Sequence, residues 1–203
     1  MTIQFKQTLA PTKDNSGKPI ILSDATFAQR NEKVLQLMRE YDFSSLMIYA
    51  DKEHGSNFEY LTGFIPRFEE AIQVINQDGT STLILGNENY NKTSMARTQS
   101  EGILCPFFSL PNQPMDFTKT FADYLKDVKV DASKRIGLVD WKLLSNDMDN
   151  FHNHHSIPAF IVDGIHEVFG SDKVVNATQL YMHPKEGARV TNNAEEIARY
   201  EYG

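Results

Sequence analysis

Few residues of this 203-residue chain could carry out chemistry, and most of them lack the partners that chemistry needs. The single cysteine, Cys105, lies in the apolar run 102–108, where burial would raise the pKa of the thiol and leave it unreactive. A lone cysteine also excludes an internal disulfide and a multi-thiolate metal site. We therefore interpret Cys105 as a buried structural thiol.

The run His152-Asn153-His154-His155 is the one local cluster that suggests a metal site, because His152 and His155 can share a helix face. No acidic or thiolate residue follows at a matching spacing, and Pro158 soon ends the element. A solvated helix end is the favoured interpretation. Asp147 and Asp149 are likewise interpreted as a solvated face.

The chain contains no Gly-x-Ser-x-Gly nucleophile elbow and no glycine-rich phosphate loop. These absences argue against a serine nucleophile of the elbow type and against a phosphate-binding loop. The net charge of −7 argues against a nucleic-acid surface, which would need clustered Lys and Arg. No basic-then-apolar start and no apolar stretch of about 20 residues occurs, so we expect a cytoplasmic protein without a membrane span.

Apolar residues recur at helical spacing in two segments. The first follows Ser23 or Asp24 as N-cap and runs to Tyr41, and the second covers residues 117–128. Shorter helices are expected at residues 88–99 with Asn87 as cap, after Ser145, and over Ala194–Tyr202 after Asn192 or Asn193. The last of these has little besides Ile197 to bury and is marginal alone. It either packs back on the domain or continues, and we favour continuation.

Runs rich in β-branched residues predict the strands. They cover residues 46–50, 71–75, 82–85, 103–108, 135–140 and 159–162. Asp78-Gly79 between the second and third runs predicts a hairpin. Because helices alternate with strands, we expect an α/β fold with three α/β/α layers and a mixed sheet. The predicted domains are a leader at 1–20, one domain at 21–188, and a terminal segment at 189–203.

Residues Asn57-Phe58-Glu59-Tyr60-Leu61-Thr62-Gly63-Phe64 form the most specific string of the chain. The string resembles the N-x-x-Y-L-T-G-F segment of the creatinase/prolidase N-terminal domain, found in M24 metallopeptidases such as Xaa-Pro aminopeptidases. Further matches follow in the same order along the chain: Arg30 and Leu37, the 46–50 strand, the Asp-Gly hairpin, the 135–137 strand, and Arg189 with Glu195-Glu196-Ile197. Asn192 departs from the family, which usually has Lys there. By itself, Tyr60-Leu61-Thr62-Gly63-Phe64 is expected to pack, with Gly63 permitting a bend.

This resemblance implies a ribonuclease H-like motif in a non-catalytic N-terminal domain, with 189–203 opening the linker helix into a catalytic domain. In the family, two Asp, one His and two Glu of that following domain hold two divalent metal ions (manganese, cobalt or zinc). None of those motifs occurs in this chain, so the resemblance implies no catalytic residue and no metal ligand here. The following domain would cleave a small Xaa-Pro peptide or a creatine-like amide. The domain itself would shape substrate access and form homodimer contacts. In relatives the loop after the motif can reach the partner's active site, which here implies Phe64, Arg67 and Phe68, beside Glu69 and Glu70. An arginine there could bind a substrate carboxylate.

A second hypothesis belongs to another functional class. Peptidase-like folds without catalysis can serve as stand-alone modules that bind peptides or proteins, because a fold does not fix a function. The sequence leaves both hypotheses open, as it does the identity of the substrate and of the metal.

Overall fold

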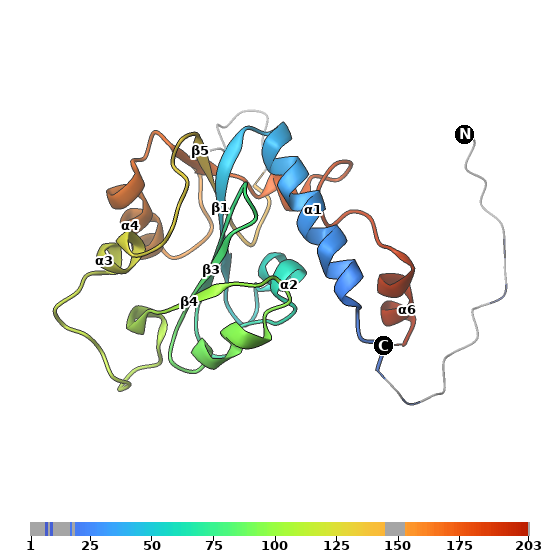
Figure 1. Cartoon of the computed structure of the whole chain (residues 1–203), viewed down its shortest axis with the longest axis horizontal. Coiled ribbons are helices and arrows are strands. Elements are labelled where there is room, and N and C mark those ends of the chain that lie inside the picture. The colour runs from blue at the N-terminus through green and yellow to red at the C-terminus, as the bar shows by residue number, and fades with distance from the viewer. Residues whose placement is uncertain (1–6, 8, 10–16, 18, 145–152, 203) are drawn as a thin grey trace.

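The β-rich runs pair into one six-stranded sheet in the computed structural model, which describes residues 7, 9, 17, 19–144 and 153–202 (Figure 1). The strands are β1 Phe43–Ala50, β2 Ala71–Asn76, β3 Ser81–Leu85, β4 Glu101–Leu104, β5 Arg135–Val139 and β6 Val174–Asn176. Their order in the sheet is β4-β3-β2-β1-β5-β6. The β1–β2 and β2–β3 pairs are antiparallel and the other pairs are parallel, so the sheet is mixed, as predicted.

Helices cover both faces of this sheet. They are α1 Asp24–Glu40, α2 Ser56–Thr62, α3 Phe121–Lys126, α4 Ala159–Phe169, α5 Gln179–Met182 and α6 Ala194–Tyr202, with 3-10 turns η1 Tyr90–Met95 and η2 Pro106–Phe108. Leu46 and Ile48 of β1 belong to the core beneath α1, α2 and α5, whereas Met47 belongs to the core beneath α3 and α4. This alternation along β1 gives the three-layer α/β/α fold.

The longest predicted helix is confirmed. Ser23 caps α1, because its side chain accepts a hydrogen bond from the Thr26 N–H at 3.3 Å. Val34 and Met38, one turn apart, are fully buried against the sheet. The Asp-Gly hairpin is also confirmed, since the β2–β3 pairing closes around Gly79 at φ +86°.

The predicted strand at residues 159–162 is wrong, because these residues begin helix α4. A four-residue apolar run fits a buried strand or a buried helix turn equally well. Ile161 and Ile165 are both fully buried, and Gly164 lies so close to Phe121 that an added Cβ would stand 2.5 Å from its ring. Packing against α3 therefore favours a helix over a strand for these residues. The last strand is instead β6, only three residues long.

Three other boundaries differ from the predictions. The segment 88–99 forms only the η1 turn, with Asn89 rather than Asn87 at its N-cap position. The strand predicted at 103–108 ends at Leu104, because Pro106 starts η2. Helix α3 begins at Phe121 after a Thr120 capping box, and Phe117 is 93% exposed. The helix predicted after Ser145 and most of the predicted leader lie outside the described residues.

Helix α6 forms where the sequence predicts it, and Asn193 caps it. The Glu196 N–H donates to Asn193 Oδ1 at 3.0 Å, and the Asn193 N–H donates to Glu196 Oε2 at 2.6 Å. The helix lies beside the start of α1 (Figure 1). In the described part of the chain, no helix has the length and apolar character to span a bilayer.

Candidate functional site

The Tyr60-Leu61-Thr62-Gly63-Phe64 string ends helix α2 and turns the chain into the loop of residues 64–70. Tyr60 and Leu61 are buried, which confirms that this string packs. Gly63 adopts the left-handed region at φ +78°, and its N–H donates to the Glu59 carbonyl at 2.9 Å. A Cβ there would lie 2.6 Å from Arg97 Cγ and 3.3 Å from the Phe27 ring, so glycine is required for both backbone and space.

The structure places the three candidate entrance residues in two different environments. Phe64 is half-buried and packs its ring edge-on to Phe58 at 5.3 Å, so it belongs to the core. Arg67 and Phe68 are exposed and adjacent, with the guanidinium carbon 5.0 Å from the Phe68 ring centre. Phe68 adopts φ +68°, an unusual conformation for an aromatic residue. The exposed tip of the 64–70 loop is therefore Arg67 with Phe68.

Two buried polar side chains, Asn89 and Glu69, hold the backbone of this tip in place. The fully buried Asn89 side chain accepts from the Arg67 N–H at 2.9 Å and donates to the Arg67 carbonyl at 3.0 Å. Asn89 also donates to Glu69 Oε2 at 2.8 Å. The buried Glu69 carboxylate accepts the Glu88 N–H at 3.0 and 3.1 Å, and Gly86 leaves room for it. The backbone at Arg67 is thus held on both sides.

Two lysines add positive charge near the loop. Lys92 donates to Asn89 Oδ1 at 2.8 Å and lies 5.7 Å from the Phe64 ring centre. Burial and the neighbouring Arg67 charge lower the pKa of Lys92. The Lys52 ammonium lies 5.8 Å from the Phe68 ring centre. The loop therefore presents exposed aromatic and cationic side chains on a fixed backbone, a combination that suits a carboxylate ligand.

The two carboxylates next to the tip, Glu69 and Glu70, lie in different environments. Glu69 is 3% exposed and its oxygens are occupied by the donors described above. Burial raises the pKa of Glu70, and the Asp51 and Glu69 charges act in the same direction. Glu69 therefore serves to hold the loop, whereas Glu70 differs from it in having a raised pKa.

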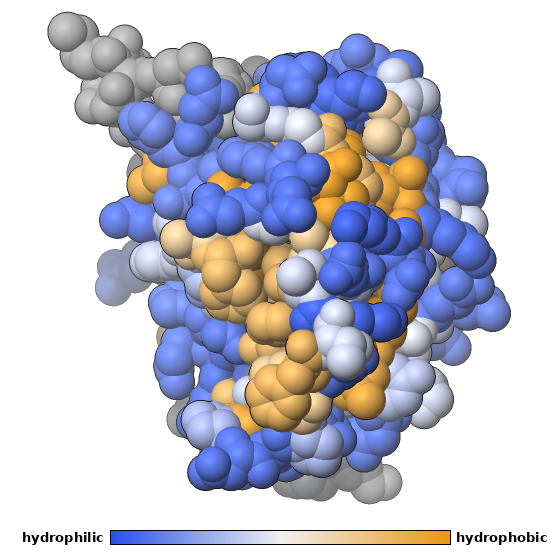
Figure 2. All heavy atoms as spheres, turned by 90° about the vertical axis from the view of Figure 1, so that its left-hand side faces the viewer, coloured by the Kyte–Doolittle hydropathy of each residue, from blue (hydrophilic) through white to orange (hydrophobic). Residues whose placement is uncertain are grey.

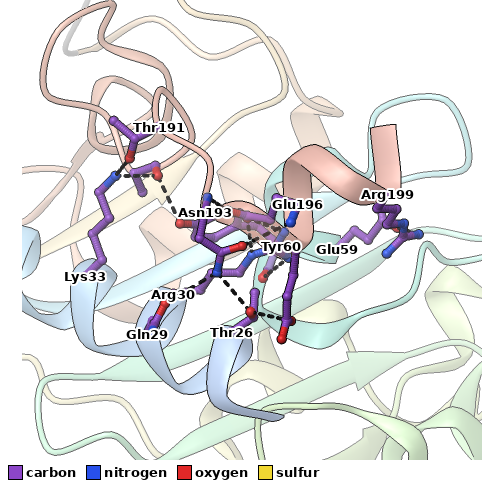
Figure 3. Close-up of polar contacts among 12 residues, drawn as sticks. Thr26, Gln29, Arg30, Lys33, Glu59, Tyr60, Thr191, Asn193, Glu196 and Arg199 are labelled. Atoms are coloured by element: carbon purple, nitrogen blue, oxygen red, sulfur yellow. Dashed lines mark hydrogen bonds and ion pairs between the residues drawn. The ribbon is translucent and has the colours of Figure 1, made fainter. Parts of the chain in front are cut away.

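A second polar cluster joins α1 to α6, and Figure 3 shows its contacts. Arg30 donates to Glu196 Oε1 from Nε at 2.9 Å and from a terminal nitrogen at 2.6 Å. Its other terminal nitrogen donates to the Tyr60 carbonyl at 3.1 Å, and the guanidinium lies 4.6 Å from the Tyr60 ring centre. Only 14% of the Arg30 side chain and 8% of the Glu196 side chain are exposed. We call this contact set the α1–α6 junction.

Neighbouring groups extend the α1–α6 junction. Glu195 accepts from the Ser23 N–H at 2.9 Å and from the Thr26 hydroxyl at 2.7 Å. These donors lower the pKa of Glu195, the Ser23 N–H contributing most. The Tyr60 hydroxyl donates to the Ala188 carbonyl at 2.9 Å, and burial raises the pKa of Tyr60 to about 12. A helix with few apolar side chains is thus held by hydrogen bonds and one buried ion pair.

The histidine run is partly described, and its interpretation as a solvated helix end is wrong for His155. The His155 side chain is 6% exposed, and its Nδ1 lies 3.2 Å from Oδ1 of the fully buried Asp140. Asp140 also accepts from the Ser156 N–H, at 2.5 Å. This pair attaches the segment before α4 to the end of β5. His152, Asp147 and Asp149 lie outside the described residues.

A second aspartate–histidine pair follows β1. His54 Nδ1 lies 2.8 Å from Asp51 Oδ2, and the His54 ring stacks on Trp141 with centroids 4.1 Å apart. Trp141 is 36% exposed, and its Nε1 donates to the Ser156 carbonyl at 2.6 Å. Both pairs therefore tie loops to the ends of parallel strands.

Cys105 is fully buried, and burial raises the pKa of its thiol to about 12, which confirms a structural role. Among residues 19–144 and 153–202, no three His, Cys, Asp or Glu side chains come together as a metal site would require. The described residues thus offer no fitting ligand set for a metal ion.

Sequence reasoning misses the residues that hold the loop. Asn89 and Lys92 lie in a polar run without periodicity, and the sequence assigns the capping role to Asn87 instead. Glu69 is noted only as a neighbour of Arg67. The sequence offers only polar residues between two strands, a pattern too common to identify the residues that hold the loop.

Comparison with known proteins identifies the family to which this domain belongs. The model of the creatinase/prolidase N-terminal domain matches residues 30–182. No curated protein sequence matches the chain. Among solved structures, prolidase from Pyrococcus horikoshii OT3 is similar with a TM-score of 0.53 and 12% identity, covering 83% of this chain and 37% of that one.

Two more solved structures show the same fold. Dipeptidase PepE from Mycobacterium ulcerans has a TM-score of 0.53 and 13% identity, covering 87% of this chain and 40% of its own. An Xaa-Pro aminopeptidase structure from Streptococcus pyogenes has a TM-score of 0.51 and 16% identity, covering 79% of this chain and 98% of its own. The chain thus spans well under half of the prolidase and of the dipeptidase. Because the family model covers most of its length, the chain belongs to the creatinase/prolidase N-terminal domain family.

Proposed function

We propose that this chain is the non-catalytic N-terminal domain of an M24-type metallopeptidase of the Xaa-Pro dipeptidase or aminopeptidase kind. In this proposal the 64–70 loop borders the substrate entrance, and Arg67 binds the carboxylate of a small peptide. The observation that carries the proposal is the fixed loop tip: Arg67 and Phe68 are exposed, while buried Asn89 holds the Arg67 backbone at both its N–H and its carbonyl. A loop whose backbone is already fixed loses less conformational entropy on binding than a mobile loop.

Catalysis would then belong to a further domain reached through residues 189–203. Prolidase and dipeptidase structures in which a chain of this fold is 37–40% of the length support this arrangement. The two divalent ions that the family implies, manganese, cobalt or zinc, would be held by that further domain. A related amidinohydrolase reaction on a creatine-like amide belongs to the same proposal, as does a cytoplasmic location.

Homodimer contacts form part of the proposal. Figure 2 shows apolar side chains gathered on the side that carries α3 and α4. There Phe160 of α4, 41% exposed, contacts Phe108 and Phe121, with ring centroids 6.4 and 5.4 Å apart. An apolar face of this kind is typical of protein interfaces. Light scattering that finds the complete protein monomeric at all concentrations would contradict this part.

The test of the loop uses the complete protein that joins this domain to its catalytic domain. Arg67→Ala is expected to raise KM for a peptide with a free carboxylate roughly 10- to 100-fold, because it removes a charge-assisted hydrogen-bond partner. The value of kcat should stay within a few-fold. Arg39→Ala is the matched control, since Arg39 lies exposed on α1 and pairs with Glu32. An unchanged KM in the Arg67→Ala variant would exclude the proposed role of Arg67 in binding the substrate carboxylate.

The chain alone should show no peptidase activity, even with added manganese or cobalt. Metal-dependent turnover by the purified 203-residue chain would contradict its non-catalytic role.

The second candidate function is a stand-alone module that binds a peptide or protein. The apolar surface over α3 and α4 favours it, because such a surface can receive a partner protein (Figure 2). The coding sequence beyond residue 203 separates the two. A following domain with two Asp, one His and two Glu in the family arrangement supports the peptidase, and a stop codon supports the module.

A further inference from the structure

A cavity of about 420 Å³ lies between α1, α2 and α6, apart from the 64–70 loop. Its lining combines apolar walls with charged groups. The buried Leu22 and Tyr60 line it, as does Tyr200, which is 76% exposed. This volume is large enough for a small organic molecule rather than a single ion.

Positive charge exceeds negative charge around this cavity. Three guanidinium groups line it, from Arg30, Arg189 and Arg199, against the two carboxylates of Glu59 and Glu196. The Glu196 carboxylate is already occupied by Arg30 in the α1–α6 junction. In a protein with a net charge of −7, a cavity lined by more guanidinium groups than carboxylates is a local exception.

Two of these arginines keep hydrogen-bonding capacity. Arg189 donates from one terminal nitrogen to Asn57 Oδ1 at 2.8 Å, and Asn57 is itself fixed because its amide donates to the Asp140 carbonyl at 2.8 Å. Arg199 reaches Glu59 only at 3.9 Å, which is too long for a hydrogen bond (Figure 3). Each guanidinium has five N–H donors, so both can still engage a carboxylate through paired bonds.

We propose that this cavity binds a small organic carboxylate with an apolar body. Arg189 and Arg199 hold the carboxylate, and Leu22, Tyr60 and Tyr200 contact the body. Asn57 positions Arg189 by fixing one of its nitrogens, so that part of the site exists before the ligand arrives. The inference is independent of the substrate-entrance role of Arg67, because it concerns other residues on other elements.

The test titrates the full chain with benzoate, with its neutral analogue benzamide, and with inorganic phosphate, while amide NMR shifts are followed. Benzoate is expected to bind with a Kd in the millimolar range and to shift amides of α6 and of the start of α2. Benzamide and phosphate should each bind at least about 10-fold more weakly, because each lacks either the charge or the apolar body. Rising salt should weaken benzoate binding.

Two variants assign the binding to the arginines. Arg189→Gln and Arg199→Gln should each weaken benzoate binding about 10-fold or more, whereas the exposed control Arg39→Gln should leave it unchanged. A urea titration of each variant verifies that it is folded. Equal binding of benzoate and benzamide, phosphate binding as tight as benzoate, or unchanged binding in folded Arg199→Gln would each overturn the proposal.

Discussion

The 64–70 loop and helix α6 are each fixed by a buried carboxylate, but in different ways. Glu69 of the loop accepts hydrogen bonds from uncharged donors, the Asn89 amide and the Glu88 N–H. Glu196 of α6 instead pairs with the Arg30 guanidinium. The comparison shows that buried polar contacts can hold a segment in place either through neutral donors or through an opposite charge. Mutations that remove the partner of each carboxylate should therefore lower the free energy of unfolding by different amounts.

The largest expected effect is at the α1–α6 junction. Arg30→Met leaves the buried Glu196 carboxylate without its cation and should lower the free energy of unfolding by about 3–5 kcal/mol. Urea unfolding followed by circular dichroism measures this loss. The control Arg39→Met removes an exposed pair with Glu32 and should cost less than about 1 kcal/mol. Equal losses in the two variants would show that the junction contributes no more than a surface pair.

A smaller loss is expected at the loop. Asn89→Ala removes the side chain that hydrogen-bonds to the Arg67 backbone and to the Glu69 carboxylate. It should lower the free energy of unfolding by about 2–3 kcal/mol. Hydrogen exchange at the Arg67 amide should accelerate as well. Asn91→Ala, exposed on the same η1 turn, is the control and should change stability by less than about 0.5 kcal/mol. Unchanged protection at Arg67 would mean that Asn89 does not hold the loop.

The turn that starts the loop gives a third measurement. Gly63→Ala should cost about 1–2 kcal/mol for its left-handed backbone, and its Cβ would in addition crowd Arg97 and Phe27. Gly79→Ala is the matched control, because Gly79 also has positive φ but its nearest neighbour, Leu35 Cδ1, is 3.9 Å away. Thermal unfolding of both compares them. If Gly79→Ala were the more damaging change, crowding at Gly63 would be irrelevant.

The smallest effect is the pH dependence, and its sign should differ between the two regions. Glu195 has a lowered folded-state pKa, so its stabilising contacts are present above the ordinary carboxyl pKa and are lost as the pH falls through the lowered value. Glu70 has a raised pKa, so burying its charge destabilises the fold at neutral pH, and acid relieves that penalty. The protection factors of the α6 amides should therefore fall, and those of amides near Glu70 should not, as the pH falls below about 5.

Two variants check this sign. In Glu195→Gln, the stability of α6 should no longer fall as the pH is lowered. In Glu70→Gln, the stability near the loop should no longer rise on acidification. The same acid response of α6 in wild type and in Glu195→Gln would exclude Glu195 as its cause.

Patterns along the chain predict most of the fold, because periodicity is a local property. The α1 helix with its Ser23 cap, the Asp-Gly hairpin and the bend at Gly63 all follow from neighbouring residues. Where a run is short, the pattern is ambiguous, and packing against α3 turns residues 159–162 into part of a helix. The candidate Arg67 and Phe68 emerge from the family resemblance, not from their spacing.

By itself, the sequence determined the α/β class, the family and the position of the loop that carries Arg67. Only the tertiary structure decided which polar groups meet: Asn89 with Glu69, His155 with Asp140, and Arg30 with Glu196. The last two residues stand 166 positions apart, and no local pattern encodes a partner at that separation. A buried polar group accepts whichever partner the folded layers bring to it, because leaving it unpaired costs more than any local preference supplies.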